Sequence, residues 1–401
     1  MKYFHLLAAA LLLTFSLSAQ LPAEVLGTRP NDNIVVGAER LNSYLPQLQN
    51  RKVAIVANPT SVVGETHLVD TLLALHVNVV KVFAPEHGFR GDAEAGAHIK
   101  SGIDEKTGLP IVSLYGSNKK PTAPQLADVD IIIFDIQDVG ARFYTYISTL
   151  HYVMEAAAEN NKKVIVLDRP NPNGFYVDGP VLQPKYKSFV GMHPIPIVHG
   201  MTIGELARMI NGEGWLEGGR TCDLSVVACV NYAHLDLYTL PIAPSPNLPN
   251  MTAIYLYPSL CLFEGTSVSV GRGTELPFQV IGHPGHKAKY AFIPQSIAGV
   301  SENPKHQGET CYGHDLTEFG NFYFTGKGQL YLEWLIGMNE ELGSEALFSR
   351  PEFFDKLAGT DRLRKAIIAG KSAEEIRLEW KDDVEKFKKL RRKYLLYSDF
   401  E

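Results

Sequence analysis

The sequence predicts an α/β fold, in which a doubly wound, mostly parallel sheet is followed by a second part that mixes strands and helices. In the first half, short apolar runs rich in β-branched residues alternate with segments of helical spacing. This βαβ repetition favours a parallel sheet. After Leu240, prolines crowd a short stretch and the pattern changes. A chain of 401 residues is too long for one ordinary core, so two domains are expected.

Residues 1–19 have the pattern of an export signal. Lys2 precedes the apolar run Leu6–Leu17, which is short for a membrane span, and small residues before Gln20 offer a cleavage site. No later segment is apolar for long enough to cross a bilayer. We therefore expect a periplasmic or secreted protein without integral membrane association.

The expected strands of the sheet are continuous apolar runs, because strands that are buried on both faces lack alternation. They are Lys52–Ala57, Val77–Phe83, Ile111–Leu114, Val129–Phe134 and Lys163–Leu167. Helical spacing is present in Thr66–Leu75 and Leu150–Asn160. A sixth unit would comprise a strand near Ile195–Val198, a helix Thr202–Asn211 with a capping box of Thr202 and Glu205, and a strand in Thr221–Val230.

The second domain is expected to span residues 241–401, after a first domain of residues 20–240. Its prolines at 241–249 indicate an ordered loop or linker. Two late helices are predicted, one over Tyr331–Leu342 and one that begins at the capping box of Ser372 and Glu375. The second of these continues through Trp380 to about Arg391.

The overall charge excludes a general attraction to nucleic acid. The formal net charge is −6, and charged residues make up 20% of the chain. The four cysteines match no zinc spacing and are expected to be buried free thiols.

Polar clusters follow the predicted strands, at the edge where α/β proteins bind their ligands. The most informative is the run Phe83–Gly91, in which Glu86, His87 and Arg90 follow a buried strand. The other strand ends supply further candidates, namely Asn58, Tyr115, Asp135, Gln137, Asp138, Arg142, Tyr144, Tyr146, Asp168 and Asn171. Because the strands are parallel, these side chains are expected to converge on one site.

Several familiar sites are excluded by the motifs that the sequence lacks. The first strand leads to Asn58-Pro59-Thr60 rather than to G-x-G-x-x-G, and there is no phosphate loop, H-E-x-x-H or G-x-S-x-G. His283 and His286 form an H-x-x-H pair in a Gly/Pro loop, which is weak evidence for a metal. No cofactor and no metal are therefore expected.

What is left is the chemistry of a carbohydrate site: carboxylates, amides, arginines and tyrosines. Glycoside hydrolysis usually needs one protonated and one ionised carboxyl group. Glu86, at a strand end where burial raises a pKa, is the expected acid, and Glu264, Asp135 or Asp138 is the expected partner. Arg272 would anchor an anionic substrate.

Structural roles compete with each of these assignments. Asp135 and Asp138 could cap a helix or bind Arg142, and Asp168 could pair with Arg169. A periplasmic sugar-binding or peptidoglycan-binding protein without turnover would use the same groups.

Six motifs resemble a known family. They are F-A-P-E-H-G-F-R-G, D-x-Q-D-V-G-x-R-F-Y-T-Y, D-R-P-N-P, S-P-N-L-P, L-F-E-G-T and G-R-G-T-x-x-P-F, in this order. The chain resembles the NamZ-type exo-β-N-acetylmuramidases from about Asn33 onward. The resemblance implies a Rossmann-like catalytic domain, an α+β C-terminal auxiliary domain, and a catalytic glutamate at Glu86.

The resemblance also implies a substrate. It is N-acetylmuramic acid at the non-reducing ends of peptidoglycan fragments such as muropeptides and disaccharides. Its lactyl carboxylate would bind Arg272, Arg142 or Arg90, and Tyr144 or Tyr146 would stack on the ring. The 2-acetamido group allows a substrate-assisted mechanism as an alternative to a second carboxylate.

Overall fold

The computed structural model describes residues 27–86, 88–90 and 102–401. The predicted export signal and His87 lie outside these ranges.

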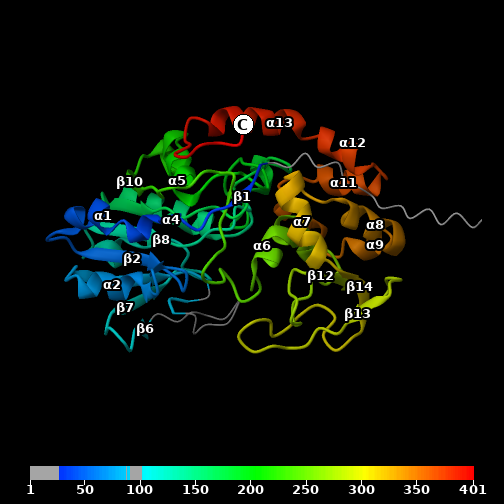
Figure 1. Cartoon of the computed structure of the whole chain (residues 1–401), viewed down its shortest axis with the longest axis horizontal. Coiled ribbons are helices and arrows are strands. Elements are labelled where there is room, and N and C mark those ends of the chain that lie inside the picture. Colours follow the sequence, from blue (N-terminus) through cyan, green and yellow to red (C-terminus); the bar gives the residue numbers. More distant parts are fainter. Residues whose placement is uncertain (1–26, 87, 91–101) are drawn as a thin grey trace, which may run out of the picture.

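The first part of the chain is built on a seven-stranded sheet (Figure 1). Its strands are β2 (Val53–Ala57), β5 (Val79–Ala84), β6 (Gly102–Ile103), β7 (Pro110–Ser113), β8 (Ile131–Asp135), β9 (Lys163–Leu167) and β10 (Asp223–Val227). They lie in the order β10-β9-β8-β2-β5-β7-β6, and all but the edge strand β6 are parallel to their neighbours. The chain order reverses between β2 and β8, as in a Rossmann-like doubly wound sheet. The predicted fold class is therefore confirmed.

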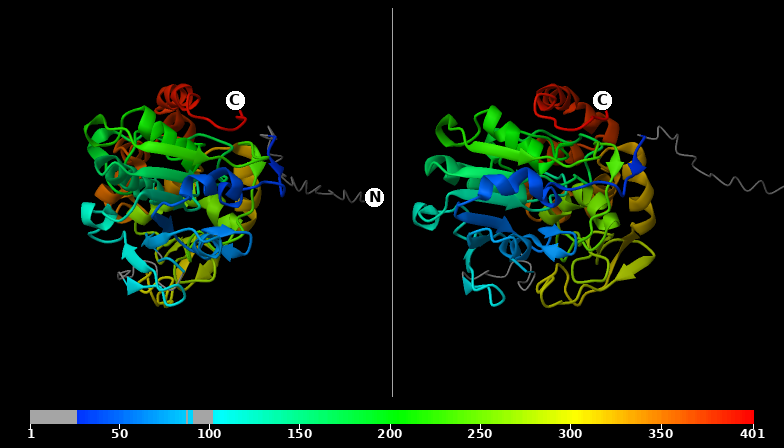
Figure 2. Two further views of the ribbon diagram at one scale, coloured as in Figure 1. Left: turned by 90° about the vertical axis from the view of Figure 1, so that its left-hand side faces the viewer. Right: turned by 60° about the vertical axis from the view of Figure 1, so that its left-hand side comes forward.

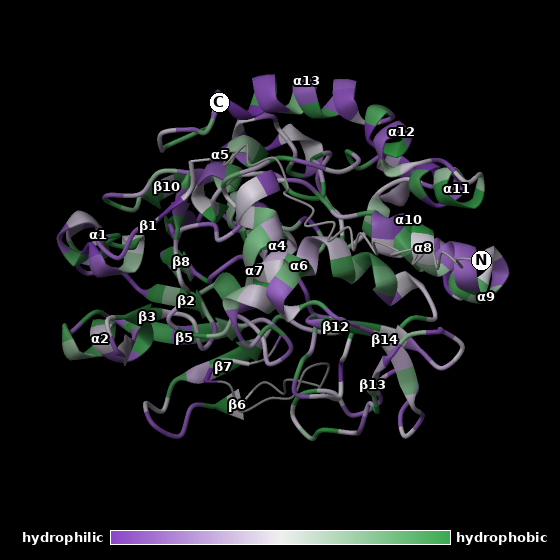
Figure 3. Ribbon diagram, turned by 45° about the vertical axis from the view of Figure 1, so that its right-hand side comes forward, coloured by the Kyte–Doolittle hydropathy of each residue, from purple (hydrophilic) through white to green (hydrophobic). Residues whose placement is uncertain are grey.

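Helices cover both faces of this sheet, and the strand residues alternate between two cores. Val53 and Ile55 pack with α1 (Leu41–Leu48) and α2 (Leu68–Ala74). Ala54 and Val56 face the opposite core with α4 (Tyr146–Glu159) and α5 (Ile203–Gly212). Burial on both sides explains the continuous apolarity of the strands, which Figure 3 shows as largely hydrophobic. The short helix α3 (Ala123–Leu126) precedes β8.

The second part combines a small antiparallel sheet with a group of helices (Figure 1). The sheet has the order β12-β14-β13, with β12 (Val280–His283), β13 (Tyr290–Phe292) and β14 (Cys311–Asp315). The helices are α6 (Met251–Leu260), α7 (Thr317–Lys327), α8 (Glu333–Leu342), α9 (Ser344–Leu347), α10 (Pro351–Ala358), α11 (Arg362–Ile368), α12 (Ala373–Leu378) and α13 (Lys381–Arg391). Short 3-10 turns span Gly37–Glu39, Pro184–Tyr186, Glu217–Gly219 and Cys261–Gly265.

The C-terminal end of the chain returns to the first part. Figures 1 and 2 show α13 and the tail that follows it (red) lying over the first part. Nε of the buried Arg391 donates to the carbonyl oxygen of Gly200, and the Tyr397 hydroxyl donates to Asp168 at 2.6 Å. These bonds tie the last helix to the sheet domain.

Two predicted elements were wrong. Residues 195–198 form no regular strand, since Val198 makes only isolated bridges with Ala141 and Asp178. The predicted last helix is divided into α12 and α13 at Trp380, whose indole N–H donates to the buried Asp178 at 2.9 Å. This hydrogen bond to a distant residue holds the Trp380 indole between α12 and α13. The spacing of apolar residues along the chain does not reveal such a contact.

Other local predictions were confirmed. Thr202 with Glu205 and Ser372 with Glu375 form the two predicted capping boxes. The predicted helix at Thr66 begins later, because Thr66–His67 is strand β4, paired with β3 (Val62–Val63). The sequence patterns did not indicate the pair β1 (Arg29–Pro30) and β11 (Asp236–Leu237). All four cysteines, which lie in the described ranges, are buried free thiols. Within those ranges no helix is both long and apolar enough to cross a bilayer.

Candidate active site

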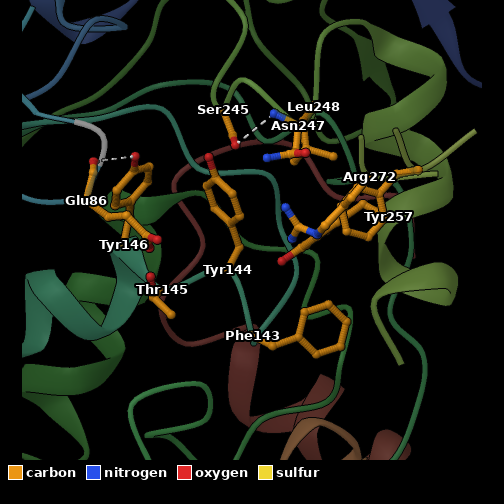
Figure 4. Close-up of a pocket in the computed structure, with 11 residues that line it drawn as sticks. Glu86, Phe143, Tyr144, Thr145, Tyr146, Ser245, Asn247, Leu248, Tyr257 and Arg272 are labelled. Carbon is orange, nitrogen blue, oxygen red and sulfur yellow. Dashed lines mark hydrogen bonds between the residues drawn. The ribbon is translucent and has the colours of Figure 1, made fainter. Parts of the chain in front are cut away.

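A pocket of about 120 Å³ lies where the carboxyl edge of the parallel sheet meets the second part of the chain (Figure 4). Its walls come from segments far apart in sequence: the loop after β5, the segment before α4, the proline-rich stretch, α6, and the loop before β12. The lining residues are Glu86, Phe143, Tyr144, Thr145, Tyr146, Ser245, Asn247, Leu248, Tyr257, Arg272 and Phe278. A junction of this kind is a usual place for a ligand site.

Among the described residues that line the pocket, Glu86 carries the carboxyl group. It stands two residues after β5, and its carbonyl oxygen accepts a hydrogen bond from the Tyr146 hydroxyl at 3.3 Å. Its carboxylate accepts a longer bond from Tyr115, at 3.4 Å. Burial raises the pKa of Glu86 above its usual value, and the Tyr115 hydrogen bond and the charges of Arg272 and Lys119 only partly oppose this rise. A carboxyl group with a raised pKa is suited to donate a proton.

Tyrosine rings form one wall of the pocket. The Tyr144 ring contacts Tyr146 and Tyr257 edge to face, with centroid distances of 5.0 and 5.8 Å. The Tyr144 hydroxyl donates to the carbonyl oxygen of Pro244 at 2.7 Å, which fixes the ring against the proline-rich stretch. The wall is therefore rigid and offers aromatic surface to a ligand.

Arg272 faces Glu86 across the pocket in Figure 4 and brings a positive charge. Its Nε lies 2.6 Å from Glu264, and its guanidinium lies over the Phe278 ring at 4.9 Å. Burial alone would raise the pKa of Glu264, but the charges of Arg272 and Lys305 keep it below its usual value. Glu264 is therefore an ionised partner of Arg272, and it does not itself line the pocket.

The proline-rich stretch contributes an amide. The side-chain Nδ2 of Asn247 donates to the carbonyl oxygen of Val300 at 2.8 Å, which sets the orientation of the amide. Its Oδ1 is buried and has no hydrogen-bond partner among the residues that the structure describes. A buried acceptor without a partner is costly unless a ligand or water supplies the donor.

Several predicted site residues are instead bound in buried ion pairs or caps. Both carboxylate oxygens of Asp135 accept hydrogen bonds from Arg169, at 2.6 and 2.9 Å, and the pair is buried. Asp168 accepts from Thr202 Oγ1 and from the backbone N–H of Gly204, at the start of α5. These two aspartates position the strand ends and do not line the pocket.

The two arginines of the first part that were predicted as site residues also bind protein groups. Arg142 has no solvent exposure and donates to the carbonyl oxygens of Pro180, Ile195 and Leu357, so it holds the two parts of the chain together. Arg90 forms ion pairs with two aspartates, Asp70 and Asp104. Neither arginine lines the pocket.

The remaining predicted residues are buried near the strand ends, outside the pocket lining. Asp138 accepts a bond from the Gly140 N–H at 2.7 Å, and burial raises its pKa to about 7. Gln137 donates to the carbonyl oxygens of Asp138 and Pro170. Asn58 accepts from Thr60, and Asn171 donates to the carbonyl oxygen of Met201.

The structure thus brings Glu86, Tyr144, Tyr146 and Arg272 together from the predicted set. The proline-rich residues Ser245, Asn247 and Leu248, together with Tyr257 on α6, were not among the predicted site residues. The S-P-N-L-P motif was the available signal, but its prolines indicated a loop or linker.

Comparison with known proteins gives matches over most of the chain. The family model "Exo-beta-N-acetylmuramidase NamZ, N-terminal" matches residues 53–252, and the corresponding C-terminal model matches residues 255–397. "Peptidoglycan beta-N-acetylmuramidase NamZ" of Bacillus subtilis (strain 168) is 42% identical over an alignment of 379 residues, and the match covers 89% of this chain and 89% of that one.

Solved structures agree with these matches. A crystal structure of a DUF1343 family protein from Bacteroides fragilis is 52% identical, with a TM-score of 0.84, and the match covers 92% of this chain and 99% of that one. A second DUF1343 family protein from the same organism is 32% identical, with a TM-score of 0.79, and the match covers 92% and 100% of the two chains.

Proposed function

Because this chain belongs to the NamZ family of exo-β-N-acetylmuramidases, we propose that it releases N-acetylmuramic acid from the non-reducing ends of peptidoglycan fragments. The protein is a glycoside hydrolase. Its proposed substrates are muropeptides and disaccharides that carry a terminal N-acetylmuramic acid. The observation that supports this function best is one pocket that holds a carboxyl group of raised pKa, a guanidinium and a tyrosine wall.

Glu86 is the proposed general acid. A raised pKa keeps a larger fraction of its carboxyl group protonated near neutral pH, so it can donate a proton to the glycosidic oxygen as the bond breaks. The same group, once ionised, can accept a proton from the water that completes the hydrolysis.

Arg272 is the proposed anchor of the lactyl carboxylate. Its guanidinium lines the pocket, whereas Arg90 and Arg142 lie outside the lining and bind other groups of the protein. The ion pair with Glu264 holds the Arg272 side chain in one orientation. A bidentate contact between its guanidinium and the lactyl carboxylate would then fix the position of the sugar in the pocket.

We favour a substrate-assisted mechanism over one that uses a second carboxylate. Among the lining residues that the structure describes, Glu86 is the one carboxylate. Its nearest predicted rival, Glu264, is bound to Arg272. The acetamido oxygen of the substrate would then attack the anomeric carbon, and Oδ1 of Asn247 would accept the acetamido N–H. Tyr144 or Tyr146 would stack on the sugar ring.

Substitution of Glu86 tests the function. We expect Glu86→Gln to lower kcat on a chromogenic muramide by about 10²–10⁴-fold, the usual contribution of a general acid, with the fold retained. Glu65→Gln, on the exposed surface, is the matched control and should keep full activity. Activity of Glu86→Gln near that of the control would remove Glu86 from the mechanism.

Incubation with purified muropeptides separates an enzyme from a binding protein. Turnover releases free N-acetylmuramic acid, whereas a binding protein would retain the fragments without release.

We also propose that residues 1–19 are removed on export to the periplasm or medium. N-terminal analysis of the native protein would test this, with Gln20 expected as the first residue.

A further inference from the structure

A pair of histidines lies in the second part of the chain, and neither residue lines the pocket. His314 belongs to β14, and His286 follows β12, the strand that pairs with β14. Their Nε2 atoms lie 3.2 Å apart. The H-x-x-H pair of the sequence is therefore not the spatial pair, because His286 meets His314 rather than His283.

The distance between the two ring nitrogens fits a shared ion. Two imidazoles on a tetrahedral zinc, each with a Zn–N bond of about 2.0–2.1 Å, place their nitrogens about 3.3 Å apart. Imidazole nitrogen is a preferred ligand of zinc and of its neighbours in the first transition row.

A carboxylate lies beside the ring of His286, where metal-binding histidines usually have one. Nδ1 of His286 is buried and lies 2.6 Å from Oε2 of Glu341 on α8, although the contact is too bent for a straight hydrogen bond. The other oxygen of Glu341 accepts the backbone N–H of Lys287, which holds the carboxylate in place. A proton on Nδ1 of His286 leaves a lone pair on Nε2, which faces His314.

We propose that His286 and His314 form a zinc-type site, in which both Nε2 atoms bind one divalent transition-metal ion and Glu341 orients the His286 ring. Water would complete the coordination, because His314 is exposed. The ion would link the turn between β12 and β13 to strand β14 and, through Glu341, to helix α8.

Zinc titration of the untagged, chelator-treated full chain tests the site. By calorimetry we expect one Zn²⁺ per chain, with binding reduced at least tenfold in His286→Asn and in His314→Asn. His76→Asn is the matched control, because His76 is an exposed histidine of the first part, and it should bind zinc as the unmodified chain does. Glu341→Gln should weaken binding without abolishing it.

Thermal unfolding gives a second readout that does not depend on activity. Zinc should raise the Tm of the unmodified chain and of His76→Asn, and leave the Tm of His314→Asn unchanged, because only an intact site gains stability from the ion. His314 is exposed, so this variant should fold even if His286→Asn does not.

The alternative is a direct hydrogen bond between two neutral rings. Equal zinc binding by all the chains, or no binding by the unmodified one, would establish that alternative and overturn the site.

Discussion

Nε of Arg272 lies 2.6 Å from a carboxylate oxygen of Glu264, and this contact gives Glu264 a different role from Glu86. Paired with Arg272, Glu264 has a pKa below its usual value, whereas burial raises the pKa of Glu86. When the environments of two carboxyl groups shift their pKa values in opposite directions, one group can act as an acid while the other stays ionised. Glu86 is thus the group able to donate a proton, and Glu264 the group that holds the guanidinium.

Tyr115→Phe should move the alkaline limb of the pH–kcat profile to higher pH. The Tyr115 hydrogen bond stabilises ionised Glu86, so its loss raises the pKa of Glu86 further and keeps the acid protonated to higher pH. At 3.4 Å the bond is long, and a shift below about one pH unit is expected. Tyr312→Phe, on the exposed surface, is the control. A limb that moved to lower pH would contradict the assignment of Glu86 as the acid.

Glu264→Gln should act on substrate binding rather than on the chemical step. Without the anionic partner, Arg272 is less firmly oriented toward the lactyl carboxylate, so KM should rise by roughly tenfold while kcat changes less. Steady-state kinetics on a chromogenic muramide separates the two parameters. If Glu264 were the second catalytic carboxylate, kcat would instead fall by about 10²-fold or more.

Asn247→Leu should reduce kcat/KM by about 5–30-fold, because the acetamido N–H loses its acceptor in the pocket. An analogue without the acetamido group lacks the proposed nucleophile, so the control compares binding: inhibition by N-acetylmuramic acid against inhibition by the sugar without the acetamido group. The loss of inhibitor affinity should be confined to N-acetylmuramic acid, and an equal loss for both sugars would indicate a purely structural role for Asn247.

Asp138→Asn should change how stability depends on pH while leaving kcat within a fewfold of the unmodified enzyme. Burial raises the pKa of Asp138 from its usual value of 3.8 to about 7, so the folded chain binds a proton that the unfolded chain releases. Stability from this group is present below about pH 4 and is lost as pH rises toward 7, by up to roughly 4 kcal/mol.

Urea unfolding of the unmodified protein and of Asp138→Asn at several pH values measures this effect. The stability of the variant should not fall in this way as pH rises from about 4 to 7. Loss of turnover in folded Asp138→Asn would return Asp138 to the list of catalytic carboxylates.

Much of the fold could be predicted because its signals are local. The runs that became β2, β5, β8 and β9 are continuous and apolar, and the capping box at Thr202 marks the start of α5. Glu86 was identifiable because it directly follows one of these runs. A site residue could be predicted from the sequence where it is adjacent in the chain to the strand or helix that positions it.

The partners of the charged side chains could not be predicted in this way. Asp135 pairs with Arg169, 34 residues away, and Arg142 donates to Leu357, 215 residues away. Asp135 and Arg142 had been predicted as ligand-binding residues, and the tertiary structure places both in contacts within the chain instead. The proline-rich stretch was underestimated for the same reason, because its Asn247 reaches the pocket only after the two parts pack together.

The sequence by itself determined the parallel sheet, the family motifs and the position of Glu86 at a strand end, since these depend on short-range patterns of burial and chain direction. Only the tertiary structure decided which charges face the pocket. A buried charge must find a partner to offset its loss of hydration, and that partner is chosen by packing between distant segments rather than by distance along the chain.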